Sequence, residues 1–150
     1  MLKFPKNSWV VVCDGAKAQI LQNVGLALEP RLRLEESLEQ PDEKNTELAT
    51  DRPGRAFQSF GTKRSAMEET DWHEEAEKEF LKQVAAKLET LVRDKEASHI
   101  VVVAPPKALG YLRPHFTSEV RAAVQAELAK DIAKLTPPEI EKHLVAWASA

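Results

Sequence analysis

Residues 51–64, DRPGRAFQSFGTKR, form the segment of this 150-residue chain whose side chains are best suited to binding chemistry. The segment has four basic side chains and one acidic side chain, a net charge of +3, whereas the whole chain has a formal charge of -3. Guanidinium groups bind phosphate through paired hydrogen bonds, and phenyl rings stack on unpaired bases. We therefore expect an RNA- or phosphate-binding loop formed by Arg52, Arg55, Lys63, Arg64, Phe57 and Phe60. The alternative is a solvated loop whose phenylalanines pack on the domain and whose arginines pair with nearby acids.

A second group of basic side chains follows the apolar run at 99–104. Lys107, Arg113 and His115 come after the predicted carboxyl end of this strand. Crevices at the carboxyl ends of strands bind ligands in open α/β sheets. These three residues are therefore a candidate site for a small anion. The alternative is that they are solvated surface charges.

Several other chemistries are not expected. Cys13 is the single cysteine, which excludes a disulfide framework and a cysteine-based zinc site. His73 and Glu77 lie one helical turn apart, but a closed metal site needs three or four converging ligands. The chain also lacks a G-x-S-x-G motif and a Walker A loop. We therefore predict no metal, no cofactor and no catalytic nucleophile.

The length and composition are those of one globular domain. A chain of 150 residues with 43% hydrophobic residues can bury a substantial core, which excludes disorder throughout. The mildly acidic total argues against a protein that coats nucleic acid by bulk charge. No stretch approaches the length of a membrane helix, and the apolar run at 9–13 is too short for a signal peptide. We expect a single domain over 1–150, located in the cytoplasm and without a membrane partner.

The first third of the chain has the pattern of three antiparallel strands. The apolar run at 9–13 is followed by Asp14-Gly15 and a second apolar run, which predicts a hairpin in which the glycine takes a positive φ. Alternation at 31–38 places Leu32, Leu34 and Leu38 on one face of a third strand. Residues 39–70 show no sustained period and are predicted to be a long loop, either functional or disordered.

The remainder alternates helix and strand. A helix is predicted from an N-cap at Asp71 to Asp94 or Lys95, followed by a central strand at 99–104. Pro106 can begin a second helix, and 120–128 fits either a strand or a helix. Thr136 begins a capping box for a final helix that extends to about Trp147. The fold class is therefore α/β or α+β, with a mixed sheet.

Several segments together resemble the bacterial family of proteins described as required for attachment to host cells. That family is itself regarded as related to the middle domain of archaeal and eukaryotic peptide-chain release factors. The matching segments, in order, are WVVVCDGAKAQIL at 9–21, TDRPGR at 50–55, Phe57, Ser59, Gly61, RSAME at 64–68, DWHEE at 71–75, VVVAPPKALGYLR at 101–113 and ELAKDIAKLTPPEIEKHL at 127–144. The resemblance implies a strand at 121–128, and hence a mixed five-stranded sheet with flanking helices. It also places the basic loop where release factors carry their catalytic Gly-Gly-Gln tip.

Three functions follow from these observations. The first is a non-catalytic module that binds RNA, on the ribosome or at a tRNA, through 51–64. The second is a protein–protein interaction module that acts indirectly in attachment to host cells. The third is a peptidyl-tRNA hydrolase, in which Gln58 would orient water. The third is disfavoured because the chain has no Gly-Gly-Gln.

Overall fold

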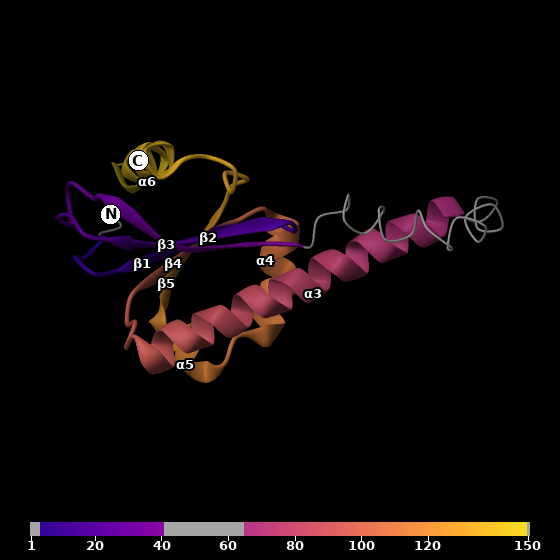
Figure 1. Cartoon of the computed structure of the whole chain (residues 1–150). Coiled ribbons are helices and arrows are strands. Elements are labelled where there is room, and N and C mark those ends of the chain that lie inside the picture. Colours follow the sequence, from indigo (N-terminus) through magenta and orange to yellow (C-terminus); the bar gives the residue numbers. More distant parts are fainter. Residues whose placement is uncertain (1–3, 41–64, 150) are drawn as a thin grey trace.

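The computed structural model describes residues 4–40 and 65–149, which form one sheet with helices on both of its faces (Figure 1). The strands are β1 (Trp9–Cys13), β2 (Lys17–Asn23), β3 (Leu32–Glu39), β4 (Ile100–Ala104) and β5 (Val124–Ala129). The helices are α3 (Ser65–Asp94), α4 (Pro106–Leu112), the 3-10 turn η1 (Arg113–His115), α5 (Ser118–Ala123) and α6 (Pro137–Ser149). The strand order is β3-β2-β1-β4-β5. The predicted class, a mixed five-stranded sheet with flanking helices, is confirmed.

The sheet is mixed because β1 pairs differently with its two neighbours. It runs antiparallel to β2 and parallel to β4, and β4 runs parallel to β5. All five residues of β1 and all five of β4 are buried. A strand covered on both faces is expected to be apolar at every position, which explains the runs WVVVC and IVVVA. The prediction of a central strand near 99–104 is confirmed.

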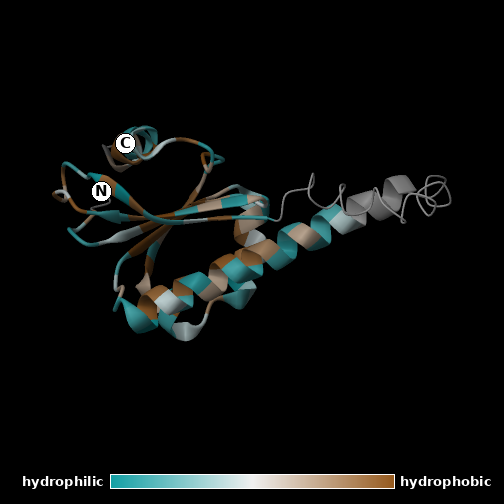
Figure 2. Cartoon of the chain, in the orientation of Figure 1, coloured by the Kyte–Doolittle hydropathy of each residue, from teal (hydrophilic) through white to brown (hydrophobic). Residues whose placement is uncertain are grey.

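Two hydrophobic clusters lie on opposite faces of the sheet. One cluster joins β1 and β4 to α3, α4 and α5, and includes Phe80, Leu88 and Leu112. The other joins the same strands to α6, and includes Ile140 and Leu144. Figure 2 shows hydrophobic residues concentrated in the strands between these layers. Cys13 is fully buried in the first cluster, and this burial raises the pKa of its thiol to about 12.

The β1–β2 hairpin is confirmed, but glycine does not make its turn in the predicted way. Gly15 does not have a positive φ. Instead, Asp14 Oδ1 accepts hydrogen bonds from the backbone N–H groups of Ala16 and Lys17, both at 2.8 Å. An aspartate side chain that binds the following backbone can substitute for a backbone turn. Asp14 therefore closes the turn.

The prediction that three leucines share one face of β3 is wrong. The pairing of β2 with β3 shifts between Ile20 and Leu21, which is the signature of a β-bulge. One extra residue reverses the faces of all that follow. Leu32 therefore packs in the cluster under α6, while Leu38 packs against the cluster under α3. Leu34 is left 45% exposed.

α3 is longer than its capping pattern predicted. It begins at Ser65, so Asp71 lies inside the helix and is not its N-cap; the predicted end at Asp94 is confirmed. Thirty residues give a length of about 45 Å. Figure 1 shows its N-terminal part extending beyond the sheet. In the described part of the chain, no helix combines the length and the apolar character needed to cross a bilayer.

The ambiguous segment at 120–128 contains both kinds of structure. Residues 118–123 form α5, whose N-cap Thr117 accepts a hydrogen bond from the Val120 N–H at 3.1 Å. β5 begins only at Val124, so the implied strand over 121–128 is corrected at its first three residues. Val120 and Ala123 are buried against the α3 side of the sheet, and a helix buries both residues on one face because they are three apart.

The capping box at the start of α6 is confirmed. Thr136 N–H donates to Glu139 Oε1 at 3.0 Å, and the Glu139 N–H donates back to Thr136 Oγ1 at 3.4 Å. Ile140 and Leu144 are buried in the cluster on this face, and Trp147 packs against it partly buried. These contacts hold α6 against the face of the sheet opposite α3.

We predict that Thr136→Ala lowers the free energy of unfolding by about 1 kcal/mol, because the first turn of α6 loses its cap. Denaturant unfolding followed by circular dichroism measures this change. Thr90→Ala is the matched control. Thr90 lies inside α3 and its hydroxyl only bonds the Ala86 carbonyl, at 3.1 Å, so its replacement should be neutral or slightly stabilising. Equal losses in both variants would contradict the role of the cap.

Candidate functional site

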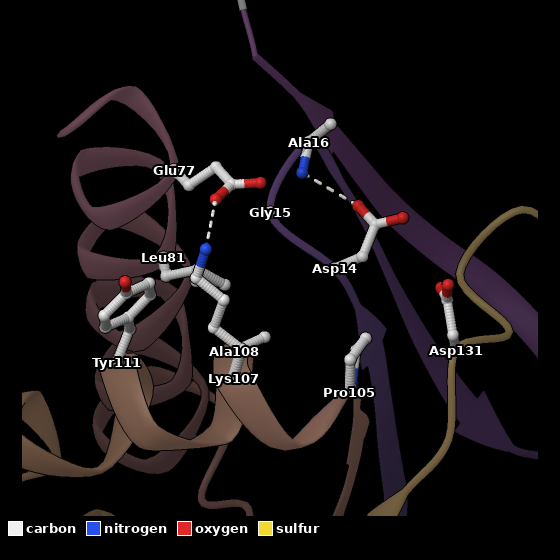
Figure 3. Close-up of a pocket in the computed structure, with 10 residues that line it drawn as sticks. All are labelled: Asp14, Gly15, Ala16, Glu77, Leu81, Pro105, Lys107, Ala108, Tyr111 and Asp131. Carbon is white, nitrogen blue, oxygen red and sulfur yellow. Dashed lines mark hydrogen bonds and ion pairs between the residues drawn. The ribbon is translucent and has the colours of Figure 1, made fainter. Parts of the chain in front are cut away.

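A pocket of about 280 Å³ lies at the edge of the sheet where the parallel strands β1, β4 and β5 end (Figure 3). Ligands bind at this edge in open α/β sheets. The lining residues come from the hairpin turn, α3, α4 and the loop after β5: Asp14, Gly15, Ala16, Glu77, Leu81, Pro105, Lys107, Ala108, Tyr111 and Asp131. The fold thus gathers four separate segments around one opening.

Gly15 leaves room for the Glu77 side chain of α3 beside the hairpin turn. A Cβ added at Gly15 would lie 2.6 Å from Glu77 Oε2 and 2.8 Å from Glu77 Cγ, closer than atoms normally approach. The Gly15 carbonyl also accepts a hydrogen bond from Gln40 Nε2 at 2.5 Å. The turn is therefore fixed between α3 on one side and the end of β3 on the other.

The opposite wall is formed by α4, where Tyr111 and Lys107 face α3. Tyr111 donates its hydroxyl hydrogen to Glu74 Oε1 at 2.5 Å, and Lys107 Nζ lies 3.7 Å from Glu77 Oε1. The ammonium groups of Lys78 and Lys107 lie 5.5 and 5.9 Å from the centre of the Tyr111 ring, within the range of cation–π attraction. These contacts bind α3 to α4.

The Tyr111–Glu74 hydrogen bond changes the acidity of both groups. It raises the pKa of Tyr111 to about 12, because ionised tyrosine would lose its donor and face a carboxylate. The same bond, followed by the charges of Lys107 and Lys78, lowers the pKa of Glu74. Glu74 therefore stays ionised and Tyr111 stays protonated at neutral pH.

Asp131 faces the pocket from the side away from Glu77 and Lys107 (Figure 3). Its loop is fixed to the sheet because the buried Gln19 donates hydrogen bonds from Nε2 to the carbonyl oxygens of Ala133 and Leu135, both at 2.7 Å. Across the pocket, the carboxylates of Asp14, Glu77 and Asp131 outnumber the one ammonium of Lys107. The pocket is therefore acidic and better suited to a cationic group than to phosphate.

The residues predicted for RNA binding lie outside the described residues. These are Arg52, Arg55, Phe57, Phe60, Lys63 and Arg64, together with Gln58. Among the residues that are described, no group of three His, Cys, Asp or Glu side chains is placed to hold a metal ion.

The candidate anion site is placed after the carboxyl end of β4, as expected, but its members have different neighbours. Lys107 pairs with Glu77, whereas Arg113 Nη2 lies 2.7 Å from Glu127 Oε1. That hydrogen bond raises the pKa of Arg113. His115 is exposed at the end of η1. Both cations already have carboxylate partners, and anion binding at the three residues stays a prediction.

The sequence reasoning missed the acidic pocket. Asp14 follows an apolar strand, and Asp131 follows β5 by two residues. A carboxylate just after a predicted parallel strand can be recognised in the sequence as a candidate ligand-binding group. Glu77 and Tyr111 could not be identified in this way, because they are brought to the same pocket by the way α3 crosses the sheet.

We predict that the pKa of Tyr111 falls from about 12 toward 10.0 in Glu74→Ala, because the carboxylate that holds the phenol proton is removed. The chain has one tyrosine, so ultraviolet absorbance during alkaline titration reports Tyr111 alone. Glu75→Ala is the matched control and should change this pKa much less, since Glu75 acts only through its charge. Circular dichroism at each pH shows whether the protein is still folded.

We also predict that Gly15→Ala is destabilising, by up to about 1 kcal/mol, because Glu77 must rotate away and leave Lys107. In a Glu77→Ala background the added methyl group has room, so the same substitution should cost much less. Gly110→Ala, in open space on α4, should instead stabilise by about 0.5–1 kcal/mol. Denaturant unfolding measures all four variants. A loss at Gly15 that is independent of Glu77 would refute the proposed contact.

Comparison with curated proteins finds no match. The model of one protein family, described as "Protein required for attachment to host cells", matches residues 9–144. The match spans every strand of the sheet, the acidic pocket and the first part of α6. Since it covers most of the chain, this protein belongs to the family of proteins required for attachment to host cells.

Proposed function

We propose that this protein is a non-catalytic binding module that contacts RNA, on the ribosome or at a tRNA, through residues 51–64. The observation that carries the proposal is the concentration of charge: a segment with a net charge of +3 and two phenylalanines in a chain with a net charge of -3. Arginine and lysine would bind backbone phosphates, and Phe57 and Phe60 would stack on unpaired bases.

The attachment of this segment to the domain supports the proposal. Residues 41–64 connect Gln40 to Ser65. The side chain of Gln40 donates a hydrogen bond to the Gly15 carbonyl at the rim of the acidic pocket. Ser65 begins α3, whose N-terminal part extends beyond the sheet (Figure 1). The basic segment is therefore joined to the domain at the end of α3 that is farthest from the bulk of the core.

Three acidic side chains in the described part of α3 have partners of their own. Glu74 accepts a hydrogen bond from Tyr111, Glu75 lies 3.4 Å from Lys78 Nζ, and Glu77 pairs with Lys107. These carboxylates do not require the arginines of 51–64 to balance their charge. In the proposal, the guanidinium groups of 51–64 bind phosphate.

The proposed RNA binding gives an indirect route to the role of the family in attachment. In this proposal the protein acts in the cytoplasm and affects attachment through the synthesis of other proteins. The resemblance to release-factor middle domains agrees with such a role. Hydrolysis of peptidyl-tRNA is not part of the proposal, because Gln58 lacks the preceding glycine pair.

A protein partner is the second candidate, and the exposed Trp72 is the observation that favours it. Trp72 is 69% exposed on α3, and tryptophan is enriched among the residues that dominate protein interfaces. Partners that are recovered with the protein after nuclease treatment, and lost in Trp72→Ala, would favour this candidate over RNA binding.

We predict salt-dependent binding to ribosomes and tRNA, measured by filter binding. If four basic residues each neutralise a phosphate of a single strand, a plot of log K against log salt should have a slope of about -2.8. Arg52→Ala combined with Arg55→Ala should reduce the slope by about 1.4. Lys130→Ala combined with Lys134→Ala makes the same change of charge elsewhere and should leave binding unchanged. Equal retention of the wild type and the arginine variant would count against the proposal.

A further inference from the structure

The acidic pocket takes no part in the proposed RNA binding, yet its size and position are those of a small-molecule site. Its volume of about 280 Å³ is just below the range of about 300–1,000 Å³ for drug-sized ligands, so a smaller molecule would fill it. It lies at the carboxyl ends of β1, β4 and β5, where ligands bind in open α/β sheets. The chemistry of its lining residues therefore indicates which ligand it accepts.

Three carboxylates line the pocket from three separate elements. Asp14 lies in the β1–β2 turn, Glu77 on α3 and Asp131 in the loop after β5. Figure 3 shows Glu77 and Asp131 on opposite sides of the opening, with Asp14 between them. They are not arranged as metal ligands, since within 4–40 and 65–149 no three His, Cys, Asp or Glu side chains are placed to hold an ion. The negative charge is spread across the pocket and suits an extended cation better than a compact one.

Two of these carboxylates have oxygen atoms that a ligand can use. Oδ1 of Asp14 accepts the two hydrogen bonds that close the hairpin turn, and no described residue donates to its Oδ2. The Asp131 carboxylate has neither a hydrogen bond nor an ion pair with any residue in the described part of the chain. Asp14 is also half-buried, so its free oxygen has lost part of its contact with water. An N–H donor from a bound cation would replace that contact.

Both carboxylates are positioned before a ligand binds. The hydrogen bonds that close the hairpin turn fix Asp14. The loop that carries Asp131 is fixed by Gln19, which is 4% exposed and donates to two carbonyl oxygens of that loop at 2.7 Å. A site whose groups are fixed in advance loses less conformational entropy on binding.

The surface between the carboxylates is apolar. Leu81 from α3 lines this part of the pocket together with Pro105 and Ala108 from the start of α4, and the side chains of Leu81 and Ala108 are buried. Figure 3 shows Pro105 and Ala108 between the sides that carry Glu77 and Asp131. An alkyl chain can pack on such a surface while its charged ends stay with polar groups, as the stems of lysine side chains do.

The pocket contains one ammonium group, and its ion pair is weak. Lys107 Nζ lies 3.7 Å from Glu77 Oε1, and the Lys107 side chain is 65% exposed. An exposed ion pair contributes little free energy, because water screens both charges. A ligand ammonium group can therefore replace Lys107 at Glu77.

From these observations we propose that the acidic pocket binds a linear aliphatic diamine or polyamine. One ammonium group would bind Glu77 in place of Lys107. The second would bind Asp14 and Asp131, and the alkyl chain would lie on the apolar surface between the two ends. Alkyl ammonium groups are charged at neutral pH and donate strong hydrogen bonds to carboxylates. The proposal does not depend on RNA binding by 51–64.

Titration of the full-length protein with putrescine and with butylamine, at constant ionic strength, tests the proposal. The two probes share the same alkyl chain and differ by one ammonium group. Putrescine should bind about tenfold more tightly in calorimetry, because it alone can reach both sides of the pocket. It should also give saturable amide shifts at 14–16, 107–111 and 131–133. Mg²⁺ should not bind, which separates a diamine site from a general attraction of cations.

Substitutions at the two sides of the pocket test the contacts. Asp131→Asn and Glu77→Gln should each weaken putrescine binding by about tenfold, the usual effect of losing a hydrogen bond between charged groups. Glu89→Gln is the matched control, because it removes the same charge about three turns further along α3, and it should leave the affinity unchanged. Lys107→Met removes the competing ammonium group and should tighten binding by about threefold.

Three results would overturn the proposal. One is the absence of saturable putrescine binding, and another is equal affinity for putrescine and for butylamine or Mg²⁺. The third is weaker binding in Lys107→Met, with circular dichroism confirming that the variant is folded, because Lys107 would then belong to the site. Arg52→Ala with Arg55→Ala should keep the putrescine affinity while RNA binding is lost, so failure of one proposal can be distinguished from failure of the other.

Discussion

The parallel pairing of β1 with β4 is the constraint on which the rest of the structure depends. Both strands are apolar at every position, so each must be covered on two faces. Parallel neighbours also require a long crossover, which α3 provides on one face, while α6 covers the other. The same pairing positions the acidic pocket, which lies where these strands end.

Features controlled by neighbouring residues could be predicted from the sequence. Thr136 and Glu139 are three residues apart and cap each other through hydrogen bonds at the start of α6. The apolar composition of the run before Pro105 is enough to identify it as a buried strand. Features controlled by distant segments could not. The bulge in β3 depends on its pairing with β2, and the start of α3 before Asp71 was hidden because its first turns carry no apolar stripe.

The candidate sites also divide into features that the local sequence predicts and features that depend on distant segments. The composition of 51–64 is visible in the sequence, and its binding role remains a proposal. Asp14 and Asp131, just after their strands, could have been recognised in the sequence. The approach of Glu77 to Gly15, 62 positions away in the chain, could not.

The irregularity in β3 has a consequence for the behaviour of the protein at high concentration. β3 is one of the two outer strands of the sheet, so one side of its backbone has no neighbouring strand among the described residues. Such an edge can recruit a strand from another molecule and start aggregation. The bulge twists this edge, and the ion pair of Arg33 with Glu35 places charge along it. A strand from another molecule could not form a regular series of backbone hydrogen bonds with this bulged edge, and it would have to pack against charged side chains. The edge therefore disfavours extension of the sheet by a second molecule.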